Sequence, residues 1–486
     1  MTKTNTKLVS NPTWRERPAR ARIITLLLLL FPIFSNLLAQ KPNVVFFLVD
    51  DLGWKDLGCY GSNYYETPAI DRLAAQGMLF TTAYAPHPVC GPSRAGIISG
   101  KMPIRTGNVG VLGDLSPGEK TMAEAFKEHG YITYFTGKWH LGMTERRDPG
   151  SQGFDRVVGV NHAGQPGSYF YPYKDIGQDW IGGKRRIIPK RDVLGLEGGK
   201  PGEFLTDRLT DEAISFIEKN KERPFFMYFS HYAVHTPLQG KETYVKHYEP
   251  KGNELTTRDV LMKIDDRAYS RIRQSNPVYA ANVQSMDESV GRITETLKRL
   301  GLEKNTIIVF TSDNGGFSTT KGGNPQTPTA NLPLRFGKGW MYEGGIRVPA
   351  VIKYPAKIQA GTKSDLAICG YDFYPTLLAL AGLPLQPDQH LDGLDIFDRQ
   401  KQKSFHKREM YWYYPQKHVS GHTPSAAIRK GDYKLILDIK TDETKLFNVK
   451  KDISESREIS TVRHKLAASL KAQLTAFIEE NKPNTD

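Results

Sequence analysis

The residues best suited to chemistry follow short apolar runs of this sequence. These runs are residues 44–49 before Asp50 and Asp51, 132–135 before Lys138 and His140, 225–229 before His231 and His235, and 306–310 before Asp313 and Asn314. Carboxylate and amide oxygens are ligands for hard divalent cations, and histidine transfers protons near neutral pH. Together the four sets predict one site with metal-ligand chemistry.

The elements that must position these residues follow from the same pattern. Short, continuously apolar runs are typical of parallel strands that are buried on both faces. Helical segments are expected between them at 67–76, 119–129, 206–220 and 282–300. Strands that alternate with helices predict an α/β fold, with a doubly wound, mixed but mostly parallel sheet flanked by helices. Such sheets bind ligands beyond the carboxyl ends of their strands, where all four runs place their polar residues.

A smaller unit is expected at the C-terminal end. A helix at 371–383 would close the main domain, and a stretch rich in proline, aspartate and glutamine follows it. Four short apolar runs and an amphipathic helix at 462–480 predict a small antiparallel sheet with one covering helix. The expected organisation is a catalytic α/β domain at 40–385, a linker at 386–404 and a small α+β subdomain at 405–486.

The first 39 residues have the pattern of a secretory signal peptide. Four arginines between positions 15 and 22 precede the apolar run 23–34, which is too short to span a bilayer comfortably. Cleavage near Ala39 would export the protein to the periplasm or the medium. No cysteine follows the run, so no lipoprotein anchor is expected. A cleaved signal peptide also leaves no stable membrane anchor in this prediction. A buried N-terminal helix is the alternative.

The chain is basic, with a formal net charge of +14 over 486 residues, and it stays basic without its first 39 residues. A positive surface attracts nucleic acid, anionic lipid or sulfated polysaccharide without choosing among them. The sequence has no nucleic-acid-binding module and no basic run interleaved with aromatic residues. We therefore expect no nucleic-acid partner.

Three cysteines, Cys59, Cys90 and Cys369, are an odd number for an exported protein. If Cys90 is reserved for chemistry, the other two either form a disulfide or stay unpaired as buried thiols.

The segment around Cys90 carries the sharpest motif. Cys90-Gly91-Pro92-Ser93-Arg94, with Thr106-Gly107 downstream, closely resembles the signature of the type I sulfatases, which belong to the alkaline phosphatase superfamily. Further matches follow in the family's order: Asp50-Asp51, Gly137-Lys138-Trp139-His140, His235-Thr236-Pro237, Asp313-Asn314-Gly315 and Gly337-Lys338-Gly339. The resemblance covers about residues 42–383, and short motifs near 431–434 and 445–447 also resemble the family's small domain.

This resemblance implies that a maturation enzyme oxidises Cys90 to formylglycine, whose hydrated form attacks sulfate esters. A serine nucleophile would be left as a stable sulfate ester, whereas a sulfated diol releases sulfate when its other hydroxyl reforms the aldehyde. The family's divalent cation is usually calcium, and hard oxygen ligands also suit magnesium. Its ligands would be Asp50, Asp51, Asp313, Asn314 and the modified residue 90.

The resemblance also assigns roles to the basic residues. Arg94 would hold the diol and nearby carboxylates, and Lys138 and Lys338 would bind the sulfate. His140 would take the proton from the second hydroxyl, and His235 would protonate the leaving alcohol.

Asp313 would assist deprotonation of the attacking hydroxyl. Some family members place a serine in the region of residue 162, where this chain has Asn161-His162-Ala163-Gly164. We expect His162 to lie at the sulfate or first-sugar pocket.

The overall pattern resembles bacterial sulfatases that act on polysaccharides or their oligosaccharides, such as ulvan, carrageenan or galactosaminoglycan fragments. Four aromatic residues would either stack on sugar rings or anchor their loop: Tyr169, Tyr171, Tyr173 and Trp180. The competing enzymatic interpretation is a phosphomonoester or phosphonate ester hydrolase of the same superfamily. A noncatalytic glycan-binding relic is a third interpretation, which the intact set of catalytic residues disfavours.

Overall fold

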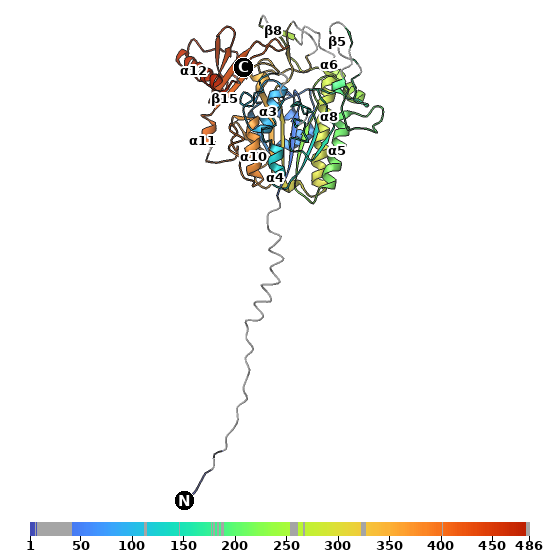
Figure 1. Cartoon of the computed structure of the whole chain (residues 1–486), viewed down its shortest axis with the longest axis vertical. Coiled ribbons are helices and arrows are strands. Elements are labelled where there is room, and N and C mark those ends of the chain that lie inside the picture. Colours follow the sequence, from blue (N-terminus) through green and yellow to red (C-terminus); the bar gives the residue numbers. More distant parts are fainter. Residues whose placement is uncertain are drawn as a thin grey trace. The chain divides into compact units, whose positions relative to one another are not determined.

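The structure is a computed structural model of the chain. It describes residues 1–4, 6, 41–110, 114–144, 146–175, 177, 180–181, 184–185, 189–252, 261–265, 268–321, 327–400 and 402–482. Residues 42–486 form one compact unit, traced in Figure 1. Most of the expected signal peptide lies outside the described residues and stays a prediction. None of the helices in the described ranges is long and apolar enough to cross a membrane.

A nine-stranded sheet forms the centre of this unit, in the order β13-β2-β12-β10-β1-β7-β3-β4, with β14 also paired to β2. The strands are β1 (Asn43–Val49), β2 (Met78–Tyr84), β3 (Ile132–Gly137), β4 (Arg156–Val158), β7 (Phe225–Ser230), β10 (Thr306–Ser312), β12 (Arg347–Lys353), β13 (Thr362–Ser364) and β14 (Ile368–Cys369). The run from β10 to β4 is parallel, and β12 is antiparallel to both of its neighbours. The predicted mixed, mostly parallel sheet is therefore confirmed.

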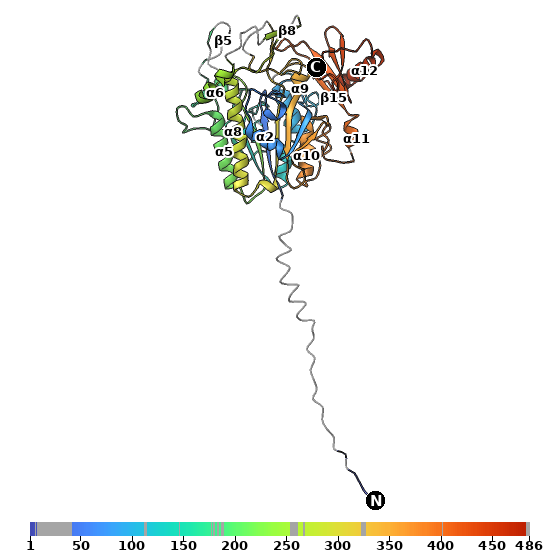
Figure 2. The same cartoon turned by 180° about the vertical axis from the view of Figure 1, so that it is seen from behind.

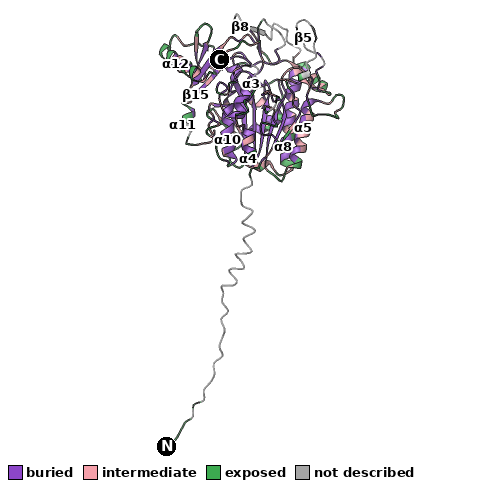
Figure 3. Ribbon diagram, viewed as in Figure 1, coloured by how far each residue is buried: buried purple, intermediate pink, exposed green. Residues whose placement is uncertain are grey.

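Helices cover both faces of the sheet. One layer contains α2 (Pro68–Ala75), α5 (Leu205–Lys219) and α8 (Pro277–Arg299), and the other contains α3 (Cys90–Ser99), α4 (Met122–Glu128) and α10 (Phe373–Leu380) (Figures 1 and 2). Alternate residues of β1 pack into two separate cores, Val45 and Phe47 on one side and Val44 and Phe46 on the other. Because successive side chains of a strand point to opposite faces, a strand covered on both sides must be apolar throughout. Figure 3 shows the resulting continuous burial along the central strands.

The predicted C-terminal sheet and covering helix are also present. The antiparallel strands β15 (Glu409–Tyr414), β16 (Ser425–Lys430), β17 (Tyr433–Asp438) and β18 (Thr444–Asn448) pair in chain order. Leu470 and Leu474 of α12 (His464–Asn481) cover one face of this sheet. The other face packs on the part of the chain that contains the nine-stranded sheet, where Trp412 donates its indole N–H to the carbonyl of Ala85 at 2.9 Å. The small sheet is therefore fixed against the segment that leads to Cys90.

The stretch 386–404, expected to be a linker, is packed against the main core. His390 and Ile396 are buried, and the Ile396 N–H donates to the hydroxyl of Thr376 at 3.0 Å. The chain then enters α11 (Gln402–Phe405), whose last residue also belongs to the core. The expected domain boundaries stay a prediction.

Shorter elements occupy parts of residues 159–202 and 239–277, two stretches whose sequence shows no clear periodicity. They include β5 (Trp180–Ile181), β6 (Lys184–Arg185), α6 (Glu242–Gly252), β8 (Leu261–Asp265) and β9 (Ala268–Arg271). Tyr169 and Tyr173 are buried in the core, and the Tyr169 hydroxyl donates to the carbonyl of Tyr232 at 2.6 Å. These two tyrosines anchor their loop and present no face to a sugar. Tyr171 is half-buried, and the side chain of Trp180 lies outside the described residues.

All three cysteines are unpaired. The disulfide between Cys59 and Cys369 that the sequence left open does not form. Cys369 is a buried thiol and Cys59 is a partly buried one, which matches the alternative in which both cysteines stay unpaired.

Candidate active site

The polar residues that follow the four predicted strands meet at one edge of the sheet. Strands β10, β1, β7 and β3 are consecutive neighbours and all run in the same direction. Backbone hydrogen bonds continue past the strand ends, from the Asp313 N–H to the carbonyl of Val49 at 3.1 Å and from the Lys138 N–H to that of Ser230 at 2.9 Å. The convergence expected from the sequence is confirmed.

Cys90 reaches the same edge by a different route. It is the first residue of α3, which follows β2, and β2 runs in the same direction as β10 because β12 is antiparallel to both. The Sγ atom of Cys90 lies 3.4 Å from Nδ1 of His140. A cavity of about 320 Å³ opens above the pair, and His235 and Lys338 also line it.

Three buried ion pairs lie at this edge of the sheet, and the Asp51–Lys338 pair lines the cavity. Nζ of Lys138 lies 2.7 Å from Oδ2 of Asp50, Nζ of Lys338 lies 2.7 Å from Oδ1 of Asp51, and Nη2 of Arg94 lies 2.7 Å from Oδ2 of Asp313. Arg94 also donates from Nη1 to the carbonyl of Lys138 at 2.8 Å and to the hydroxyl of Ser230 at 2.6 Å. Buried charges are tolerated when each is paired and hydrogen-bonded. Three cations and three carboxylates therefore balance within the protein.

The carboxylates titrate differently because their neighbours differ. Burial raises the pKa of Asp50 well above its ordinary value, and although Lys138 opposes this effect, the charges of Asp313 and Asp51 add to it. Burial also acts to raise the pKa of Asp51, but Lys338 and His235 outweigh it and hold that pKa below its usual value. Mutual repulsion among three clustered carboxylates is the electrostatic setting that a bound cation relieves.

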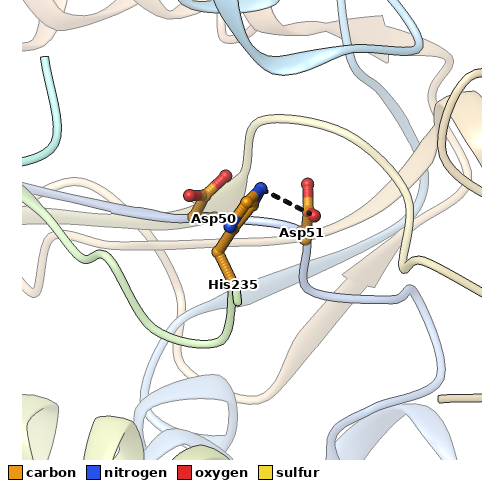
Figure 4. A group of neighbouring side chains, drawn as sticks. All are labelled: Asp50, Asp51 and His235. Atoms are coloured by element: carbon orange, nitrogen blue, oxygen red, sulfur yellow. Dashed lines mark ion pairs between the residues drawn. The ribbon is translucent and has the colours of Figure 1, made fainter. Parts of the chain in front are cut away.

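The donor set fits a hard divalent cation. The Asn314 amide nitrogen donates to Oδ1 of Asp51 at 2.8 Å, while the Asn314 side-chain oxygen and Oδ1 of Asp50 are buried without a hydrogen-bond partner. Ligand atoms of Asp50, Cys90 and Asp313 all lie within 4.8 Å of one another. Oxygen atoms that lack a donor are the ligands that calcium and magnesium require. Asp50 and Asp51 form a second such group with His235, shown in Figure 4, where Nε2 of His235 lies 3.6 Å from Oδ2 of Asp51.

The two candidate proton-transfer histidines are both neutral in this arrangement. Burial and then Lys138 lower the pKa of His140 well below its usual value. Burial and then Lys338 lower the pKa of His235 to about 3. Nδ1 of His235 lies 3.0 Å from the carbonyl and 3.1 Å from the hydroxyl of Thr236, and Nε2 faces Oδ2 of Asp51. Both rings can therefore act first as bases.

The backbone at the site is strained at two of the predicted site residues. Asp51 and His140 both have a φ of +59°, which side chains other than glycine rarely adopt. Gly164 covers the imidazole of His140 so closely that a Cβ atom at position 164 would lie 2.6 Å from Cε1 of that ring. The loop at 161–165 therefore fixes the position of His140.

Not every predicted residue lies in the cavity. His162 is exposed and is not among the lining residues, whereas Gly164 and Gln165 of the same loop line it. A contact between His162 and substrate stays a prediction. His87 and His231 are buried outside the cavity lining and bond to the carbonyl of Tyr413 at 3.2 Å and to the hydroxyl of Ser289 at 3.1 Å.

Some lining residues carry no recognisable sequence signal. Phe317, His418 and Val419 border the cavity beside Cys90. His418 and Val419 come from the loop between β15 and β16, in the small C-terminal sheet. No motif includes them, and only the packing of that sheet against the catalytic part brings them to the site.

Similarity to known proteins agrees with this geometry. The family model named Sulfatase matches residues 42–383, and the model for the C-terminal part of N-sulphoglucosamine sulphohydrolase matches residues 334–482. The chain is 32% identical over 464 residues to N-acetylgalactosamine-6-sulfatase of Rattus norvegicus, an alignment that covers 89% of this chain and 80% of that protein. It is 30% identical to a sulfatase of Formosa agariphila, with 92% of this chain and 90% of that one aligned.

Among solved structures, the crystal structure of Ps i-CgsB in complex with k-i-k-neocarrahexaose is similar to this one with a TM-score of 0.75 and 31% identity. The match covers 92% of this chain and 94% of that chain. The relation thus extends over the catalytic sheet and the C-terminal sheet alike.

Proposed function

Since this chain belongs to the sulfatase family and is a sulfuric ester hydrolase, we propose that it is an exported, calcium-dependent glycan sulfatase that uses formylglycine at position 90. The observation that carries this proposal is the placement of Cys90 against His140, at the edge where three paired cations and three carboxylates meet. A site for a sulfate ester needs a nucleophile, proton carriers and buried positive charge within one cavity.

A cation and the modified residue 90 fit the residues present. A bound cation supplies two positive charges that polarise sulfate oxygens, and formylglycine supplies a hydroxyl nucleophile whose adduct releases sulfate. Asp50, Asp51, Asp313 and Asn314 would hold the cation. The protein's own charges at the site balance. The positive charge of a bound cation would therefore offset the negative charge of the substrate and of the ionised nucleophile.

The chain's own side chains would divide the remaining work. Arg94, locked by Asp313 and Ser230, orients the group at position 90. Lys138 and Lys338 place ammonium charge beside the sulfate oxygens. His140, at 3.4 Å from the Cys90 sulfur, is placed to take a proton from the group at position 90.

His235 would protonate the leaving alcohol. Its Nε2 faces the site beside Asp51, and the pKa that burial lowers to about 3 leaves the free ring neutral. The negative charge of a bound sulfate ester raises the proton affinity of this ring. We infer that His235 becomes an acid only once substrate is bound.

The names of the relatives indicate a class of sugar. One relative is named for N-acetylgalactosamine 6-sulfate, and one similar structure holds an oligosaccharide of carrageenan, a sulfated galactan. We propose a sulfated galactose or galactosamine residue of a polysaccharide or its oligosaccharides as the substrate. Ulvan fragments are the other algal candidate that the sequence favoured.

Export and maturation belong to the same proposal. The N-terminal pattern predicts cleavage near Ala39, and a maturation enzyme must reach Cys90 before folding is complete, because the folded residue is only 4% exposed. Mass spectrometry of the Cys90 peptide from the native host tests this step. We expect the mass of formylglycine, and an unmodified thiol in an inactive protein would refute the mechanism.

Matched aryl substrates test the reaction class. We expect kcat/KM for 4-nitrophenyl sulfate to exceed that for 4-nitrophenyl phosphate, and faster phosphate cleavage would favour the phosphoester hydrolase instead. Turnover of N-acetylgalactosamine 6-sulfate and of carrageenan and ulvan oligosaccharides then identifies the sugar. His162→Ala tests the predicted contact of that residue, because unchanged affinity and turnover on the preferred sugar would exclude it.

A further inference from the structure

The small C-terminal sheet contributes one wall of the catalytic cavity. His418 and Val419, in the loop between β15 and β16, line this cavity together with Cys90 and Lys338. The catalytic residues all come from the main sheet and its loops. One wall of the cavity is therefore supplied by a part of the chain that carries none of the proposed catalytic residues.

This loop is held in a fixed position relative to Lys338. The indole N–H of Trp340, two residues beyond Lys338, donates to the carbonyl of Ser420 at 3.2 Å. Within the loop, the Gly421 N–H donates to the carbonyl of His418 at 3.0 Å. The loop is thus anchored to the segment that carries the catalytic lysine.

The imidazole of His418 rests directly on that segment. Gly339 has a φ of +87°, and a Cβ atom there would lie only 2.3 Å from Nδ1 of His418. The glycine after Lys338 therefore has two functions, because it adopts a left-handed backbone and leaves room for this ring. His418 and Lys338 are consequently neighbours in the cavity wall.

The hydrogen bonds of His418 determine which ring nitrogen carries the proton. The backbone N–H of Ser420 donates to Nδ1 at 3.3 Å, and the hydroxyl of Ser420 lies 2.9 Å from the same atom. A backbone amide can only donate, so Nδ1 accepts and the neutral ring carries its proton on Nε2. Within the ranges that the structure describes, Nε2 has no hydrogen-bond partner, and it is not sealed from solvent.

We propose that His418 is a specificity-determining residue, whose Nε2–H donates a hydrogen bond to a hydroxyl or ring oxygen of the sugar that bears the sulfate ester. The proposal rests on the proposed sulfatase function and deepens it. A neutral donor suits an uncharged sugar oxygen, whereas the sulfate is already served by Lys138 and Lys338. Val419 is 77% exposed beside His418 and offers an apolar contact for a sugar face.

A simple aryl sulfate lacks the sugar oxygen that His418 would bind. Loss of the donor should therefore affect sugar sulfates and spare aryl sulfates, which a purely structural role would not do. His418→Phe removes the donor and keeps a ring, and His418→Gln keeps an N–H donor. His464→Phe, at an exposed histidine that begins α12, is the matched control.

The experiment compares these three variants with the unchanged enzyme, each with verified formylglycine content. The substrates are 4-nitrophenyl sulfate, N-acetylgalactosamine 6-sulfate and k-i-k-neocarrahexaose. For the sugar sulfate that the enzyme cleaves best, we expect His418→Phe to raise KM about tenfold, as expected for one lost hydrogen bond in a binding site. Its kcat/KM on the aryl sulfate should stay within about threefold of the control, and His418→Gln should recover part of the loss.

Three outcomes would overturn the assignment. If His418→Phe lowers kcat/KM equally on aryl and sugar sulfates, His418 is a structural residue. If the KM of this variant for the sugar sulfate is unchanged, His418 does not contact the sugar. An unchanged enzyme that cleaves the aryl sulfate but none of the sugar sulfates would also contradict a sugar contact. Failure of the unchanged enzyme on the aryl sulfate and on both sugar sulfates, despite formylglycine, would instead refute the proposed function.

Discussion

Nζ of Lys138 lies 2.7 Å from Oδ2 of Asp50, and both side chains are fully buried. The pair joins the ends of β3 and β1, two strands that do not pair directly, since β7 lies between them. It therefore connects a proposed sulfate-binding cation to a proposed metal ligand across an intervening strand. A substitution in this ion pair should therefore change both the stability of the fold and the activity of the site.

Lys138→Met should impair both stability and activity. Removal of the ammonium leaves Asp50 buried without its main counter-charge, which costs about 3–5 kcal/mol of unfolding free energy for a broken buried pair. Loss of charge at the sulfate should lower kcat/KM for 4-nitrophenyl sulfate by about 100-fold or more. Urea unfolding and steady-state kinetics measure the two effects. Lys304→Met, at an exposed lysine, is the control and should change neither; a stable Lys138→Met protein would contradict the pairing energy.

Metal removal should abolish turnover and loosen the fold. Oδ1 of Asp50 and the side-chain oxygen of Asn314 lack protein donors, so chelation with EDTA leaves repelling buried groups without a cation. A ligand present at about 100 times its Kd stabilises the folded state by about 2.7 kcal/mol, so Tm should fall on chelation and recover with Ca²⁺. Asn314→Ala should weaken that recovery. If EDTA changes neither Tm nor rate, the metal assignment is wrong.

Gly164→Ala should damage catalysis more than folding. A Cβ atom at this position would lie 2.6 Å from Cε1 of His140, so the imidazole must shift from the position in which its Nδ1 lies 3.4 Å from the sulfur of Cys90. A displacement of this kind costs about 100-fold in rate when it disturbs a reacting geometry. Gly118→Ala is the matched control, because its nearest neighbour would be the Ser116 hydroxyl at 3.7 Å. Equal activity of the two variants would show that His140 is not held by this loop.

Stability should decline in mild acid partly because of His231. Burial lowers the pKa of this histidine to about 3, whereas the unfolded chain has a value near 6.5. A depressed histidine pKa means that the unfolded state binds the extra proton, so the stabilisation is full above about pH 6.5 and is lost as pH falls toward 3. Between pH 7 and pH 5 this one group should cost about 2 kcal/mol.

A His231→Asn variant checks the assignment. Urea unfolding at pH 7 and at pH 5 should show a smaller loss of stability for the variant than for the unchanged protein. His464→Asn, at an exposed histidine, should keep the full loss. A variant at position 231 with the same pH dependence as the unchanged protein would show that other groups account for it.

Much of the site could be predicted from local sequence. Residues 44–49 are apolar on both faces, so they had to form an internal strand, and Asp50 and Asp51 had to follow its carboxyl end. The same reasoning applied to the strands before His140, His235 and Asp313, and their common direction placed them at one edge. The sequence predicted a mixed sheet but did not identify β12 as its antiparallel strand, because an apolar strand has the same pattern in either direction.

Other features depended on contacts between distant segments. Tyr169 and Tyr173 had the composition of a sugar-stacking surface, yet both are buried anchors, since exposure depends on what packs above a loop. The sequence also could not decide between a disulfide and free thiols at Cys59 and Cys369. His162 was singled out from its place in the chain, whereas Gly164 and Gln165 occupy the cavity wall.

The sequence by itself determined the type of fold, the motif around Cys90 and the set of acids, lysines and histidines, because strand periodicity and local motifs are encoded in neighbouring residues. Only the tertiary structure decided which charges pair, which oxygens are left for a cation and which side chains complete the cavity. His418 illustrates the difference, since it meets Lys338 only because the C-terminal sheet packs against the catalytic part. Packing is a property of the whole chain, and no local pattern specifies it.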